Sequence, residues 1–204
     1  KNNYGLEEGE MKVVGVPRHE RRWIERILQE SKNDVPESWA RFIFLISRPA
    51  NSDFFSKEEK RQALEDIRKL AFEELQCKIV IKVHPTERVP KNSNAALFDE
   101  ILGAQAYGKE WIYSSMHSCA LGTRSMFAVA FHSGVAVDML AIGVPVIERL
   151  NLGSMSELSG DTRALTKRYR NRGLVLSAEN YDELKRHALM ILNDKDALMQ
   201  RLRP

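Results

Sequence analysis

The sequence predicts an α/β protein in which an open parallel sheet carries helices on both faces. Short apolar runs of strand length alternate with helical patterns at least five times along the chain. The run Arg41–Ser47 (RFIFLIS) is apolar almost throughout, which is typical of a central parallel strand covered on both faces. The stretch Phe127–Ile147 (FAVAFHSGVAVDMLAIGVPVI) indicates strand, tight turn, buried helix and second strand without a break.

Composition limits the classes of function. The chain has 204 residues, of which 43% are apolar, enough for a substantial core. Lys and Arg (31) exceed Asp and Glu (28) by only three, so charge does not favour a nucleic-acid partner. Cys77 and Cys119 have no metal-ligand spacing, which predicts a reduced, cytoplasmic setting. Asp138, two glycines and Pro145 argue against a membrane span between Met126 and Ile147.

The first residues have the pattern of a linker. Lys12–Val16 resembles a short strand, Glu20–Gln29 has helical periodicity, and Ser31–Ser38 is a polar connector. We therefore expect residues 1–38 to be a linker strand and helix from a preceding domain, and residues 39–204 to form one Rossmann-like domain that binds a ligand.

The elements that follow have start and stop signals of their own. Ser56 and Glu59 form a capping box, and Pro85 ends a strand. In order, we expect a helix over Lys57–Gln76, a strand over Lys78–Val83, a helix over Ala95–Leu102, a strand over Glu110–Tyr113 and a helix to about Gly122. After the central stretch, we expect a polar segment over Asn151–Arg172, a strand over Leu174–Leu176 and a helix over Glu179–Leu192.

The turn His132-Ser133-Gly134 in the central stretch is the strongest functional signal. A helix over Val135–Ile142 would begin there, with unpaired backbone N–H groups that favour an anion such as phosphate. Asp138 is the only charge in this helix and lies one turn after Gly134, so its carboxylate could accept hydrogen bonds from ribose or sugar hydroxyls. The alternative is that Asp138 bonds a neighbouring backbone or basic group.

Polar residues also follow three other strands of the predicted sheet. They are Ser47-Arg48, His84-Pro85 and Ser114 to Ser118. Because ligands of open α/β sheets bind beyond the carboxyl ends of the strands, we interpret the four loops as one phosphate-rich site. His84, held by Pro85, would donate to a phosphate or act on a leaving group; the alternative is a structural histidine.

The remaining candidates have structural alternatives of equal or greater weight. His132 would share the anion or pack under the turn, Ser133 would cap the helix, and Arg48 would contact phosphate or stay solvated. Ser118, with Ser114, Ser115 and His117, would bind base or ribose, although Ser118 fits a helix cap better. A basic run would contact an anionic acceptor or form a solvated face: Arg163, Lys167, Arg168, Arg170 and Arg172.

These motifs resemble a known family. Lys82-Val83-His84-Pro85 and the later Phe131–Ile147 segment resemble the C-terminal, donor-binding half of GT-B glycosyltransferases with an HP motif. The resemblance is to enzymes of capsule and surface polysaccharides, including CMP-Kdo, sialic acid and CDP-glycerol transferases. Val14–Arg18 resembles the G-x-P-R segment between the two halves of such enzymes. The family commonly has Glu at the position of Asp138 and a second Ser or Thr at that of Gly134.

The resemblance implies roles for single residues. His84 and Pro85 would contact the donor's phosphate, with His84 as the catalytic group, while Ser133, Gly134 and Asp138 would complete the donor site. The reaction would be sugar transfer from a CMP- or CDP-linked donor to a glycan or glycolipid acceptor.

The resemblance also implies what surrounds the site. The N-terminal acceptor domain would be missing from this chain. Neither a metal nor a cofactor is implied, nor is nucleic acid. The location would be cytoplasmic, and a peripheral place at the inner membrane stays open. The rival functions are a nucleotide-sugar epimerase of GT-B type and a non-catalytic module that binds nucleotide or phosphate.

Overall fold

In a computed structural model of the chain, six parallel strands form one sheet in the order β3-β2-β1-β4-β5-β6. The structure describes residues 15–50, 55–87, 94–151 and 167–202. The strands are β1 (Phe42–Ile46), β2 (Lys78–Lys82), β3 (Trp111–Tyr113), β4 (Phe127–Ala130), β5 (Val146–Arg149) and β6 (Leu176–Ala178). The outer strands β3 and β6 have three residues each. The predicted α/β fold, an open parallel sheet with helices on both faces, is confirmed.

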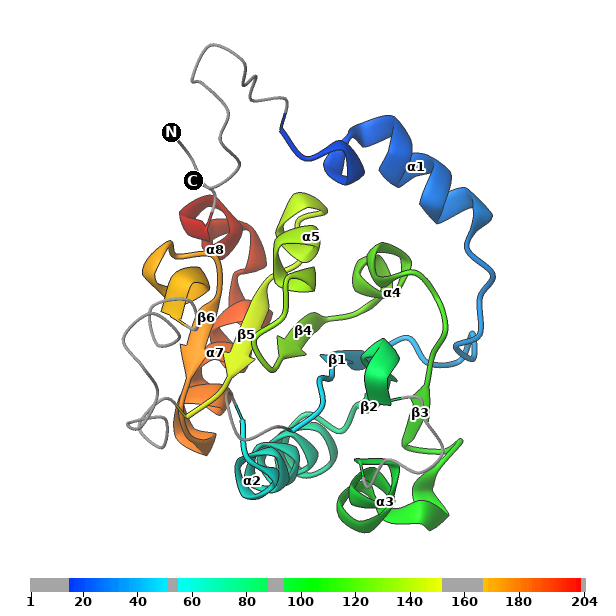
Figure 1. Cartoon of the computed structure of the whole chain (residues 1–204), viewed down its shortest axis with the longest axis vertical. Coiled ribbons are helices and arrows are strands. Elements are labelled where there is room, and N and C mark those ends of the chain that lie inside the picture. The colour runs from blue at the N-terminus through cyan, green and yellow to red at the C-terminus, as the bar shows by residue number, and fades with distance from the viewer. Residues whose placement is uncertain (1–14, 51–54, 88–93, 152–166, 203–204) are drawn as a thin grey trace, which may run out of the picture.

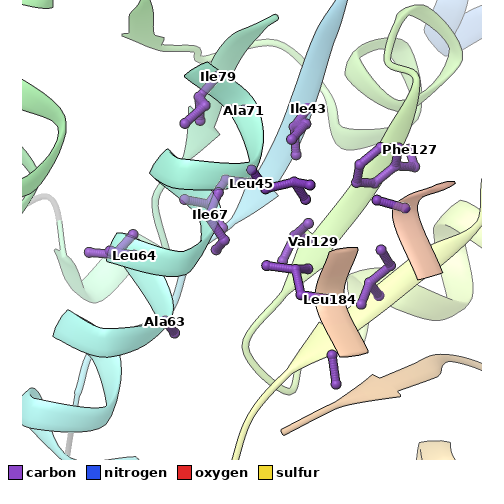
Figure 2. Close-up of a cluster of buried hydrophobic side chains, with 14 of the residues drawn as sticks. Ile43, Leu45, Ala63, Leu64, Ile67, Ala71, Ile79, Phe127, Val129 and Leu184 are labelled. Atoms are coloured by element: carbon purple, nitrogen blue, oxygen red, sulfur yellow. The ribbon is translucent and has the colours of Figure 1, made fainter. Parts of the chain in front are cut away.

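Helices cover both faces of the sheet (Figure 1), and a hydrophobic core lies on each face. On one face pack α2 (Lys57–Arg68), α3 (Asn94–Phe98) and α7 (Tyr181–Asn193). Alternate strand residues such as Ile43 and Leu45 belong to the same core as Leu64 and Ile67 of α2, and Figure 2 shows Ile67 beside Leu45. On the other face, α4 (Ser118–Arg124) and α5 (Val135–Ala141) cover a second set of strand residues that includes Phe44.

Local signals set the helix ends. Ser56 Oγ accepts from the Glu59 N–H while the Glu59 carboxylate accepts from the Ser56 N–H, so the predicted capping box forms. The helix continues beyond α2 as a π-helical segment over Lys69–Glu74. Helix α5 ends before Gly143, which has φ of +75°, the left-handed conformation that glycine adopts without strain.

The linker region forms a 3₁₀ turn over Pro17–His19 and the helix α1 over Arg21–Glu30. Helix α1 lies beside α4, on the outside of that face of the sheet (Figure 1). Its Ile24 is half-buried, whereas Trp23 stays 46% exposed. Most of the predicted strand at residues 12–16 lies outside the described residues, and Gly15 and Val16 are not in a strand. The domain boundary at residue 38 stays a prediction.

The second half of the chain differs from the prediction in several places, one of which is a short helix over residues 167–171 inside the expected polar segment. Strand β5, expected from Val144, begins at Val146, because the Val144 N–H still bonds the Met139 carbonyl at the end of α5. Strand β6, expected from Leu174, begins at Leu176, because the Leu174 N–H still bonds the Tyr169 carbonyl in the turn around Gly173. Helix α4 runs on to Arg124. The sequence did not predict α8 (Lys195–Leu202), which packs against α7. Among the described residues, no helix combines the length and apolarity needed to cross a bilayer.

Candidate functional site

The strand order reverses between β1 and β4, and the candidate residues gather around that point. Helix α2 follows β1 on one face, while α5 follows β4 on the other, so the two connecting loops diverge at the carboxyl edge of the sheet. A crevice at such a switch point is the usual ligand position in open α/β sheets. Arg48, after β1, donates from Nη1 to the carbonyl of His132, after β4, at 2.9 Å.

His84 lies in the loop after β2, one strand further along the same edge. Its Nδ1 accepts from the backbone N–H of Thr86 at 3.3 Å and lies 2.8 Å from the Thr86 hydroxyl. A backbone N–H can only donate, so the neutral ring carries its proton on Nε2. Because His84 is exposed, this Nε2–H can donate to an anion at the carboxyl edge.

A buried ion pair lies beneath the loops after β1 and β2. Lys60 of α2 bonds Glu87, and their side chains are 0% and 1% exposed. Glu87 accepts from the Ser47 hydroxyl at 3.0 Å and from the His84 backbone N–H at 2.9 Å. Burial lowers the pKa of Lys60, and the charge of Glu87 opposes that shift. The sequence reasoning missed both residues, although a lysine on the apolar stripe of α2 is a signal for a buried partner.

The turn after β4 has an uncommon backbone. His132 has φ of +49°, a left-handed conformation that is rare outside glycine. Its Nδ1 lies 3.2 Å from a carboxylate oxygen of Glu148, whose side chain is 1% exposed. An ionised carboxylate can only accept a hydrogen bond, so Nδ1 carries a proton. In the neutral ring, Nε2 of His132 is therefore an acceptor, the reverse of His84.

The start of α5 differs in detail from the prediction. Gly134 is the N-cap residue, whereas Ser133 Oγ accepts from the N–H of Val135 at 3.3 Å. The predicted role of Ser133 as N-cap is corrected to that of a hydroxyl beside the cap. A side chain at Gly134 would meet the Tyr169 hydroxyl at 3.5 Å, and the Tyr169 ring lies 5.1 Å from that of His132. The helix has only seven residues, so its dipole adds little beyond its first N–H groups.

Two arginines of the basic run, Arg168 and Arg170, bond other side chains of the protein. Arg170 donates to Glu148 at 2.7 Å and to Glu179 at 3.0 Å, and so connects β5 with the segment before α7. Arg168 donates to the Tyr169 hydroxyl at 2.7 Å. Arg163 lies outside the described residues. The Glu148 carboxylate therefore accepts from both His132 and Arg170. These residues are far apart in the sequence, so no local pattern predicts the contact.

The serine loop after β3 is bonded to the connector of the linker. The Asp34 carboxylate accepts from the Ser114 hydroxyl and from both the N–H (2.6 Å) and the hydroxyl (2.8 Å) of Ser115. Burial acts to raise the pKa of Asp34, but these hydrogen bonds outweigh it and leave the pKa lowered. Ser118 is not the cap of α4; His117 is, with Nδ1 accepting from the Cys119 N–H at 3.2 Å.

Asp138 is bonded to the linker. Its Oδ1 accepts from Arg18 Nε at 2.7 Å and lies 2.6 Å from His19 Nε2. This contact with basic groups is the structural alternative considered for Asp138; whether the carboxylate also meets a donor ribose stays a prediction.

The structure thus brings most candidates to one edge. Arg48, His84, Pro85 and the turn at His132 to Gly134 belong to the loops after β1, β2 and β4, which are adjacent in the sheet. Because neighbouring strands lie about 4.8 Å apart, the loops after β2 and β4 are separated by roughly 10 Å. Ser118 and Asp138 lie on α4 and α5, toward the linker. Among the described residues, no three His, Cys, Asp or Glu side chains could hold a metal ion together.

Comparison with known proteins supports the fold. The chain is similar to the UDP-GlcNAc 2-epimerase of Methanocaldococcus jannaschii in complex with UDP-GlcNAc and UDP (TM-score 0.61, 17% identity, 94% of this chain and 50% of that chain). It is similar to a UDP-N-acetylglucosamine 2-epimerase described from Listeria monocytogenes (TM-score 0.57, 14% identity, 88% and 45%). It is also similar to the wall teichoic acid polymerase TagF (TM-score 0.53, 15% identity, 97% and 48%).

These enzymes are of the GT-B type, and the chain spans about half the length of each. Neither a protein-family model nor a curated protein sequence matches the chain. At these identities, the similarity establishes a Rossmann-like fold of the kind found in one half of GT-B enzymes.

Proposed function

We propose that the chain is the donor-binding half of a GT-B glycosyltransferase, which binds a nucleotide-activated sugar at the carboxyl edge of the sheet. The carrying observation is the set of cationic and N–H groups at the carboxyl edge of the sheet: Nε2–H of His84, the Arg48 guanidinium and the backbone N–H groups of the turn Ser133-Gly134 before α5. A nucleotide diphosphate or monophosphate linkage is the ligand chemistry that such groups suit.

In the proposed reaction, the sugar leaves its nucleotide and negative charge develops on the departing phosphate. His84 stabilises that charge by donating from Nε2, and the N–H groups of Ser133 and Gly134 share it. Arg48 adds a positive charge, and Asp138 and Ser118 would bind hydroxyl groups of the nucleoside. Burial lowers the pKa of Arg48, and the electrostatic effects of Tyr169, Glu148 and Glu87 oppose this shift. A guanidinium is basic enough to stay charged at neutral pH.

The finer parts of the proposal follow from the resemblance. The donor is CMP- or CDP-linked, the acceptor is a glycan or glycolipid, and the product contributes to a surface or capsular polysaccharide. A second half with the acceptor site completes the enzyme, which works in the cytoplasm or at the inner face of the membrane. Neither a metal nor a separate cofactor takes part.

The second candidate is a nucleotide-sugar epimerase, which the similarity to two UDP-GlcNAc 2-epimerases favours. Product analysis with the complete enzyme separates the two, because transfer needs an acceptor and gives a new glycosidic bond. A non-catalytic nucleotide-binding module would give neither product.

A thermal-shift panel of CMP, CDP, UDP and GDP tests the common basis of these functions. A nucleotide at 100 times its Kd stabilises the chain by about 2.7 kcal/mol. For a protein of this size, that corresponds to a rise in Tm of roughly 5–10 °C. The variant His84→Ala should keep its Tm without nucleotide and lose most of the rise. If none of the four nucleotides raises Tm, the proposal is wrong; if His84→Ala unfolds the chain, His84 is structural.

A further inference from the structure

The buried pair Lys60–Glu87 has more contacts than its own salt bridge. Glu87 accepts from the backbone N–H of His84 at 2.9 Å and from the Ser47 hydroxyl at 3.0 Å. Lys60 donates to Glu87 and also to the carbonyl of Arg48 at 2.9 Å. One ion pair therefore bonds the main chain of both His84 and Arg48, in two different loops.

Stability alone does not account for such a pair. Removing two charges from water costs several kcal/mol per ion, and apolar residues of similar volume often stabilise a core at least as well. A buried pair does, however, fix the groups that bond to it, because every alternative arrangement would leave a charge without a partner. Here the groups so fixed are two proposed phosphate-binding residues.

We propose that Lys60 and Glu87 are positioning residues, which hold His84 and Arg48 in the geometry that binds the phosphate of the nucleotide donor. The inference rests on the proposed function and deepens it. Neither residue touches the ligand. Glu87 fixes the main chain at His84, and the Thr86 N–H then fixes the ring through Nδ1, so that the direction of the Nε2–H is set before the nucleotide arrives.

The test uses two variants and a matched control. Glu87→Gln removes one charge and leaves Lys60 buried without a counter-charge. Lys60→Met combined with Glu87→Gln removes both charges, and one amide oxygen cannot replace two carboxylate oxygens as acceptor for Ser47 and His84. The control is Asp66→Asn, which breaks another buried ion pair of α2, that with Arg149, away from His84.

Two measurements are made on each chain at a temperature where it is folded. NMR of the ¹⁵N-labelled His84 ring reports the tautomer, assigned with His84→Ala. Calorimetry reports the Kd of the nucleotide that raises Tm most in the wild type. We expect a single Nε2–H tautomer in the wild type and in Asp66→Asn, and a mixture in both Glu87 variants. We expect Kd to rise about tenfold in those variants, the effect of one lost hydrogen bond to a charged group.

The outcomes separate the two proposals. If the His84 tautomer and Kd stay at wild-type values in the double variant, the positioning role is refuted. If Asp66→Asn changes them as much as the Glu87 variants do, the effect is general destabilisation and the inference also fails. If the wild type binds no nucleotide while Glu87 variants still change the tautomer, the proposed function fails and the positioning of the imidazole stands.

Discussion

The ion pair between Asp66 of α2 and Arg149 of β5 offers a sharp test of the packing. Arg149 donates to Oδ2 of Asp66 from Nε (2.8 Å) and from Nη2 (2.6 Å), and Gln62 donates to Oδ1 at 3.1 Å. The two side chains of the pair are 8% and 5% exposed, so water cannot replace the lost partner. The pair ties a helix on one face to the carboxyl end of a strand.

The variant Asp66→Asn keeps the shape of the side chain and removes its charge, which leaves a buried guanidinium without a counter-ion. Breaking a buried pair in this way costs about 3–5 kcal/mol of unfolding free energy. In a chain of this length, each kcal/mol corresponds to about 2–4 °C, so Tm should fall by roughly 6–20 °C. Urea unfolding followed by circular dichroism measures the free energy, and the slope m should stay unchanged.

The double variant Asp66→Leu with Arg149→Met is the control, because it removes both charges and keeps apolar volume. Its unfolding free energy should lie within about 1 kcal/mol of the wild type. A loss below about 1 kcal/mol in Asp66→Asn, or an equal loss in the double variant, would refute the reasoning from burial.

Three further predictions concern other parts of the molecule. In Gly122→Ala, the new Cβ would lie 2.5 Å from Sδ of the fully buried Met139. We expect the variant to be less stable, because the overpacking cost of about 1–3 kcal/mol exceeds the gain of about 1 kcal/mol in helix propensity. An increase in the urea midpoint of unfolding would contradict this. Burial raises the pKa of the Cys77 thiol to about 11, so a thiol reagent at neutral pH should label Cys77 only at the rate of unfolding, and rapid labelling of the folded chain would show that the site opens locally. Burial and the hydrogen bond to Glu74 raise the pKa of Tyr181 to about 12. Because an unfolded tyrosine ionises near pH 10, the contribution of Tyr181 to folding stability is complete below about pH 10 and is lost as the pH rises to about 12. The tyrosinate absorbance of the wild type minus that of Tyr181→Phe should show this late titration, and a difference titration near pH 10 would contradict it.

Much of the fold could be predicted because it depends on local patterns. The apolar run at Arg41–Ser47 indicated a strand buried on both faces, and β1 is buried at every position. The capping box at Ser56 indicated where α2 begins. Where the prediction failed, tertiary pairing decided: β6 is defined by its register with β5, in which Leu176 pairs with Ile147, and not by its own apolar residues.

The candidate site was predictable only in part. Strand ends mark the edge where His84 and His132 lie, since parallel strands share one carboxyl edge. The partners that orient these residues come from distant segments, such as Glu148 for His132 and Asp34 for Ser115. Such pairs leave no periodic signal in a single sequence. Lys60 is the exception, because a lysine on the buried stripe of α2 requires a counter-charge.

The outermost strands of the sheet, β3 and β6, are its shortest, and their length affects how the protein can associate with other chains. Strands β3 and β6 have only three residues each, and their outer edges are partly bonded already, since the Trp111 carbonyl accepts from the Gly108 N–H at 2.9 Å and the Ser177 carbonyl lies 3.0 Å from His187 Nε2. Such short, partly bonded edges offer little backbone for pairing with another chain. Edge-to-edge growth of the described sheet is therefore disfavoured. A macromolecule that binds this protein would therefore recognise side chains of its loops and helices and not the peptide backbone of the sheet edges.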